Sequence, residues 1–147
     1  MRTPVVLCIG TDTVSGDALG PIVGDLLTDR YNVNAYVYGR TERTVNGGNF
    51  GVYSKFIERM HPKSYVIAVD ACVGNREDVG KIKVADGVKA GGALAKNHGK
   101  VGNVGILGVV CEKSSDNLFS LMNVDLKFVE ELGARIAEKI ALVLAAV

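Results

Sequence analysis

The chain has 147 residues, a length typical of one domain, and its 48% of hydrophobic residues are enough to bury a core, which excludes a disordered protein. Its 17 Lys and Arg residues nearly balance the 16 Asp and Glu residues and form no long basic run. The charges therefore predict neither nucleic-acid nor membrane-surface binding. The 18 glycines, against three prolines, indicate tight loops and close backbone contacts.

The three cysteines, Cys8, Cys72 and Cys111, lie in apolar surroundings without the spacing of a zinc or disulfide set. We predict reduced, buried thiols. The apolar stretch near the N-terminus is too short for a signal peptide, and the run over 140–147 is too short to span a bilayer. The sequence thus predicts a soluble, cytoplasmic protein.

The N-terminal half alternates strand and helix. A continuous apolar run predicts a buried strand over 5–9, and apolar positions at helical spacing follow from Ala18. Pro21 fits only the first turn of that helix. A second strand over 33–38 and a helix over 53–60 come next, separated by Gly47-Gly48-Asn49.

The C-terminal half begins with a third buried strand over 65–69, which we expect to end at Asp70. The alternating segment 79–85 follows too closely for a helical crossover, so we predict an antiparallel strand, an edge at which another copy could pair. A glycine-rich surface loop over 86–100, a buried strand over 104–110 and a helix over 126–147 complete the pattern. We therefore predict a single domain over 1–147, a three-layer α/β/α sandwich with a mixed five-stranded sheet.

Two carboxylates follow buried strands, Asp17 in the loop after the first and Asp70 directly after the third. Because loops at the carboxyl ends of parallel strands form the ligand crevice, we expect the two side chains to face one another. Such a pair can activate water as base and acid, or it can hold a divalent metal ion. The alternative for Asp17 is a helix cap. Asp12 is expected to orient the loop.

The glycine clusters are expected to line the same site. Gly10, Gly16 and Gly20 would bring the backbone close to the carboxylates, without forming a Walker A loop or a dinucleotide-binding motif. Glycines between 91 and 105 would form the opposite border. His98 in that loop is a candidate third metal ligand or general base, and its alternative is an ordinary surface residue.

Two motifs together resemble a known family. The segment 10–21 reads G-T-D-x-x-x-G-D-A-L-G-P, and 61–72 reads H-P-x-x-Y-V-I-A-V-D-A-C. Both resemble the YyaC-type sporulation proteins of spore-forming Firmicutes, relatives of the spore germination protease. More distantly, residues 10–21 are similar to the opening of hydrogenase maturation endopeptidases, in which two carboxylates and a histidine bind nickel.

The resemblance implies a phosphorylase/hydrolase-like fold with one antiparallel strand, with Asp17 and Asp70 as the functional carboxylates. It implies a peptidase-like protein of sporulation or germination, in the mother cell or forespore, that acts on a peptide or protein substrate. No cofactor is firmly implied, although Asp17, Asp70 and His98 could hold a divalent metal. The alternative is a non-catalytic spore protein of the same fold that binds a partner or small ligand.

Overall fold

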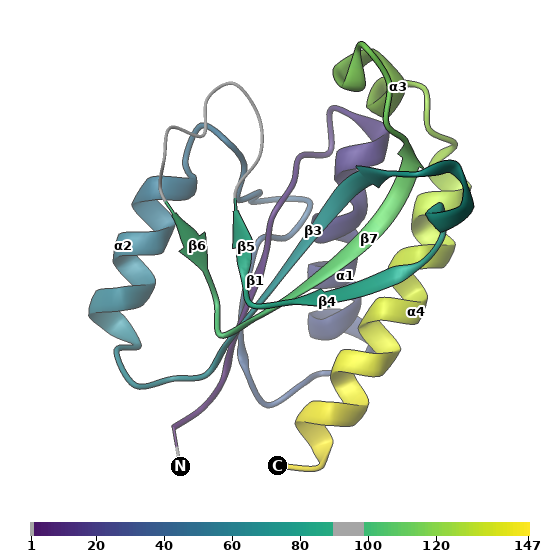
Figure 1. The fold of residues 1–147 in the computed structure, drawn as a ribbon. Coiled ribbons are helices and arrows are strands. Elements are labelled where there is room, and N and C mark those ends of the chain that lie inside the picture. The colour runs from purple at the N-terminus through teal and green to yellow at the C-terminus, as the bar shows by residue number, and fades with distance from the viewer. Residues whose placement is uncertain (1, 90–98) are drawn as a thin grey trace.

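The structure, a computed structural model, describes residues 2–89 and 99–147 (Figure 1). Its elements in chain order are β1 (Val5–Cys8), the 3₁₀ turn η1 (Ser15–Ala18), α1 (Leu19–Asp25), the π-helical turn η2 (Leu26–Arg30), β2 (Tyr36–Tyr38), α2 (Phe50–Met60), β3 (Val66–Gly74), the 3₁₀ turn η3 (Arg76–Asp78), β4 (Ile82–Ala85), β5 (Val88–Lys89), β6 (Lys100–Val101), β7 (Val104–Glu112), α3 (Asn117–Met122) and α4 (Leu126–Ala145).

The main sheet has five strands in the order β2-β1-β3-β7-β4. The first four are parallel, and β4 runs antiparallel to β7 with Ile82 opposite Gly108. This confirms the mixed sheet and the direction predicted from the short connection before β4. The segment predicted as a loop over 86–100 also contributes β5 and β6, which pair as a separate two-stranded sheet.

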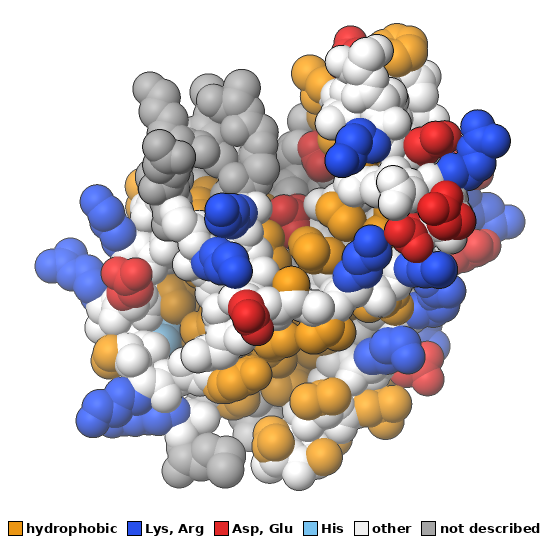
Figure 2. Space-filling view, viewed as in Figure 1, with side chains coloured by type: hydrophobic (Ala, Val, Ile, Leu, Met, Phe, Trp, Pro, Cys, Tyr) orange, Lys and Arg blue, Asp and Glu red, His pale blue; other side chains and the backbone are white. Residues whose placement is uncertain are grey.

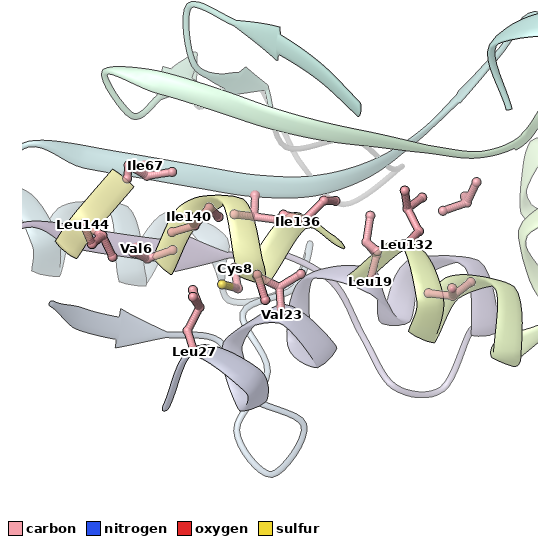
Figure 3. Packing of buried hydrophobic residues seen from close by; sticks show 14 residues of the cluster. Val6, Cys8, Leu19, Val23, Leu27, Ile67, Leu132, Ile136, Ile140 and Leu144 are labelled. Carbon is pink, nitrogen blue, oxygen red and sulfur yellow. The ribbon is translucent and has the colours of Figure 1, made fainter. Parts of the chain in front are cut away.

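Helices cover both faces of the sheet and produce three layers (Figure 1). On one face, α1 and α4 pack on β1, β3 and β7 around a large apolar cluster (Figure 3). On the other face, Phe50 and Ile57 of α2 join a smaller cluster. Strand β1 contributes side chains to both clusters. Val6 and Cys8 belong to the larger cluster and Val5 and Leu7 to the smaller one, which explains why its apolar run is uninterrupted.

The long C-terminal helix follows the predicted periodicity. Asp125 caps it by accepting a hydrogen bond from the Lys127 backbone N–H at 3.1 Å. Its buried face consists of Val129, Leu132, Gly133, Ile136, Ala137, Ile140 and Leu144. Leu144 ends this face, and α4 itself ends at Ala145, two residues before the predicted end.

Two other boundaries differ from prediction because neighbouring strands decide them. β3 continues through Asp70 to Gly74, since the equally long β7 provides hydrogen-bonding partners along its whole length. The predicted strand 33–38 is reduced to β2, whose three residues are those paired with β1. Helix α3 was not predicted, although Leu118, Leu121 and Met122 recur at helical spacing after the capping Asp116.

Within the described ranges 2–89 and 99–147, no helix combines the length and the apolar character needed to cross a bilayer.

Candidate active site

The loop after β1 folds back on itself at Gly10 and thereby places Asp17. The Thr11 backbone N–H donates to the Asp17 carbonyl at 3.0 Å, and the Asp17 N–H donates to the Val14 carbonyl at 2.9 Å. Gly10 has a φ of 154°, and a Cβ at this position would lie 2.1 Å from the Asp17 carbonyl oxygen. Only glycine therefore permits this approach.

Helix α1 starts directly against the end of β1. A Cβ on Gly20 would lie 2.1 Å from the Ile9 carbonyl oxygen, so the backbones of helix and strand touch there. The N-cap of α1 is Ala18, and no side chain of the described residues caps it. The alternative of Asp17 as a helix cap is thus not supported, and its carboxylate is free for another role.

Asp70 lies in the middle of β3, just beyond the end of the neighbouring β1, whose Cys8 pairs with Val69. The expectation that the third strand ends at Asp70 was wrong, but the strand next to it does end there. One carboxylate oxygen of Asp70 accepts a hydrogen bond from the Ala71 backbone N–H at 2.9 Å. The shorter β1 leaves space above Asp70, and that space is the site.

Burial raises the pKa of both carboxyl groups, and the negative charge of Asp17 adds to the shift at Asp70. Removal from water, followed by the negative charge of Asp17, raises the pKa of Asp70 well above its usual range, and the hydrogen bond from Ala71 opposes this shift. Removal from water also raises the pKa of Asp17. A negative charge near a carboxyl group favours the protonated form of that group. Asp70 is therefore harder to ionise than an ordinary aspartic acid.

Both carboxylates line one cavity of about 720 Å³, a size typical of small-ligand sites. Its apolar lining comes from Ile9, Ala71, Cys72, Val73, Val88, Leu107, Leu118 and Leu121. Its polar and glycine lining comes from Gly10, Thr11, Asp17, Asn46, Gly47, Asp70, Gly87, Lys89 and Asn117. The cavity thus combines an apolar surface with two carboxyl groups.

The structure brings together Asp17, Asp70 and Gly10 among the predicted site residues. Gly16 and Gly20 lie beneath the site, where they permit close packing against Leu121 and Ile9 respectively. Asp12 is exposed and lies outside the lining of the cavity.

The predicted glycine border on the opposite side is not observed for Gly99, Gly102 and Gly105, which lie outside the lining of the cavity. Gly105 instead packs against the backbone of Gly87. His98, Gly91 and Gly92 fall outside the described residues.

Several lining residues were missed by sequence reasoning. Asn46 precedes the glycine pair that was interpreted only as a break before a helix. Its side-chain oxygen accepts from the Gly48 N–H at 2.9 Å and its amide donates to Thr44 at 3.0 Å, so it fixes the turn at the cavity edge. An Asn followed by two glycines is a turn signal that could have pointed to this loop. Asn117 and Leu118 belong to α3, where the N-cap residue Asp116 before an apolar pattern is a helix signal that could have pointed to this segment.

The site offers two oxygen ligands to a metal ion. Carboxylate oxygens suit hard divalent cations. Among residues 2–89 and 99–147, no three His, Cys, Asp or Glu side chains come together as a metal-binding group. The nearby thiol of Cys72 has its pKa raised, mainly by burial, which disfavours the thiolate that a metal or a nucleophilic mechanism would need. Metal binding through Asp17, Asp70 and His98 stays a prediction.

Comparison with solved structures defines the class of fold. The [NiFe] hydrogenase maturation protease HycI from Thermococcus kodakarensis KOD1 is similar with a TM-score of 0.61 and 22% identity, covering 97% of this chain and 92% of that one. Peptidyl-tRNA hydrolase from Acinetobacter baumannii is similar with a TM-score of 0.63 and 12% identity, covering 97% and 88%. At these identities the likeness establishes the α/β fold, which agrees with the predicted one.

Sequence comparison places the chain more narrowly. It belongs to the family described as "Protein of unknown function (DUF1256)", which matches residues 1–139. It is 36% identical to the "Uncharacterized protein YyaC" of Bacillus subtilis (strain 168) over 139 residues, 94% of this chain and 68% of that protein. The resemblance to YyaC-type proteins inferred from the two aspartate motifs is confirmed.

Proposed function

We propose that this protein is an aspartate-dependent peptidase in which Asp17 and Asp70 together activate a water molecule. The observation that carries the proposal is the placement of both carboxyl groups in one cavity, with Asp70 made hard to ionise by burial and by the charge of Asp17. A pair that holds one proton has a base and an acid within the same site. Peptide hydrolysis requires both.

In this proposal Asp17 is the base and Asp70 is the acid. Ionised Asp17 takes a proton from water while the water oxygen attacks the peptide carbonyl carbon, and protonated Asp70 donates its proton to the carbonyl oxygen. The tetrahedral intermediate then collapses. The C–N bond breaks, the leaving nitrogen takes the proton held by Asp17, and a hydroxyl of the intermediate returns a proton to Asp70. Both carboxyl groups end in their starting states.

The substrate in this proposal is a peptide or protein of a spore-forming bacterium, acted on during sporulation or germination. The fold shared with a maturation protease supports the peptidase part of this proposal. The spore-forming context rests on the resemblance of the two aspartate motifs to YyaC-type proteins. The cavity, at about 720 Å³, is within the size range of pockets that enclose a drug-sized ligand.

A mixture of synthetic decapeptides that contains every pair of adjacent residues tests the activity, with products read by mass spectrometry between pH 4 and pH 9. We expect cleavage by the wild-type protein and a loss of about 10²- to 10⁴-fold in Asp17→Asn and in Asp70→Asn, the usual contribution of an acid or base. Glu130→Gln, on the exposed surface of α4, removes a charge away from the cavity and should leave the rate unchanged.

The pH profile tests the role assignment. Activity should fall at low pH as Asp17 becomes protonated, and at high pH as Asp70 loses its proton, which gives a bell-shaped curve. Full activity in Asp70→Asn would refute the mechanism. Absence of cleavage by the wild-type protein, together with binding of peptides in the cavity, would favour the alternative of a non-catalytic ligand-binding protein.

A divalent metal is a second form of the same proposal. Asp17 and Asp70 would hold the ion, which would supply Lewis acidity when bound. Isothermal titration of the wild-type protein with Mn²⁺, Ni²⁺ or Zn²⁺ tests it, with Asp70→Asn as the comparison. Micromolar binding that Asp70→Asn abolishes would support this form, whereas equal binding by both proteins would contradict it.

A further inference from the structure

Helix α3 forms one wall of the carboxylate cavity. It follows β7, and Asp116 caps it by accepting from the Phe119 N–H at 3.0 Å. Asn117, Leu118 and Leu121, spaced so that they share one side of the helix, line the cavity. Leu118 is 59% exposed although it is a large aliphatic side chain. Figure 2 shows hydrophobic side chains on the projection that α3 forms at the upper right.

This wall is fastened to the turn that carries Asp17. The Ser15 hydroxyl lies 2.7 Å from the Val124 carbonyl oxygen and 3.2 Å from that of Leu121, so it holds the end of α3. Gly16 allows Leu121 to pack directly on the turn, since a Cβ there would lie 2.8 Å from the Leu121 side chain. The hydrogen bonds of Ser15 and the packing of Leu121 on Gly16 therefore join the apolar wall to the turn that carries Asp17.

We propose that Leu118 and Leu121 form an apolar subsite that selects a large aliphatic or aromatic side chain of the substrate, next to the bond on which Asp17 and Asp70 act. This inference rests on the proposed peptidase function. Leu118 lines the cavity yet gains little from the fold, because more than half of its surface meets solvent. A substrate side chain that covers it would release that apolar surface from water, which favours binding. Small or charged side chains would gain nothing there.

Two capped pentapeptides test the subsite, one with a central leucine between alanines and one of alanine alone. Their binding to the full chain carrying Asp70→Asn is measured by NMR titration, and cleavage by the wild-type protein is measured separately. We expect the leucine peptide to bind about tenfold more tightly and to shift the amide signals of residues 117–122. Leu118→Ala in the same background should remove most of that preference.

Leu142→Ala provides the matched control, because Leu142 is 65% exposed on α4 and lies outside the lining of this cavity. It should leave the preference for leucine intact. Equal affinity for both peptides, or an unchanged preference in Leu118→Ala, would overturn the subsite. Peptides that bind with the expected preference but remain uncut by the wild-type protein would overturn the peptidase and leave the subsite standing, so the two failures are distinguishable.

Discussion

Substitution of Gly10 by alanine tests whether the approach of the β1 loop to the Asp17 turn is essential. The new Cβ would lie 2.1 Å from the Asp17 carbonyl oxygen and 2.9 Å from Cδ of Pro21. A Cβ contact shorter than 3.0 Å is essentially never observed, so the Asp17 carbonyl must retreat by about 0.9 Å. Its hydrogen bond from Thr11, now 3.0 Å long, would stretch or break.

Two free-energy terms combine in this variant. Overpacking against a backbone atom costs about 1–3 kcal/mol, and loss of the Thr11 hydrogen bond costs about 1 kcal/mol. We therefore expect Gly10→Ala to lower the free energy of unfolding by about 2–4 kcal/mol. Because a displacement of about 1 Å in a catalytic group costs roughly 10²-fold in rate, we expect cleavage by the folded fraction to fall by about that factor.

Urea denaturation followed by circular dichroism measures the loss of unfolding free energy. Decapeptide cleavage at a temperature where the variant is folded measures the loss of rate. Gly48→Ala is the control, because its Cβ would meet only the side-chain oxygen of Asn46 at 3.2 Å. A Gly10→Ala protein within about 0.5 kcal/mol of the wild-type stability would show that the loop relaxes freely, and the argument from close approach would be wrong.

Three further outcomes follow from the same structure. Burial and the charge of Asp17 raise the pKa of Asp70 in the folded chain, so wild-type stability should fall as pH rises from about 4 through that pKa. Asp70→Asn should therefore be more stable than wild type at pH 7 and equally stable below pH 4, as measured by urea denaturation at each pH. A gain in stability that persists at low pH would show that the raised pKa of Asp70 is not its cause. Ser15→Ala, which removes the hydroxyl held 2.7 Å from the Val124 carbonyl, should cost about 1 kcal/mol and increase hydrogen exchange across residues 117–124; unchanged exchange there would refute the fastening of α3. Ile136→Ala, in the centre of the buried face of α4, should lower stability by about 2–5 kcal/mol in the same denaturation assay, and a loss below 1 kcal/mol would show that the core collapses around the gap.

The two aspartates show which features of the site could be predicted from the sequence. Asp70 directly follows an apolar run, and Asp17 lies in the polar loop after another, so both could be selected from the sequence as candidates. Their relation depends on strand order, and β1 lies beside β3 although about 60 residues of chain separate them. That Asp70 lies inside a strand, opposite Leu107, depends on the length of β7. No pattern within residues 65–72 contains that information.

Local patterns were sufficient wherever one residue's physical limits decide the structure. The apolar run of β1 requires burial on both faces, Pro21 restricts the start of α1, and the short connection before β4 forces an antiparallel strand. Tertiary structure alone decided the rest. α3 forms the cavity wall because the end of β7 and Ser15 hold it there, and the pKa of Asp70 is raised because burial and the Asp17 charge act through space. The excess of glycines is explained in the same two steps. The composition predicts close backbone contacts, and the fold shows that Gly10 packs against the Asp17 turn and Gly20 against the end of β1.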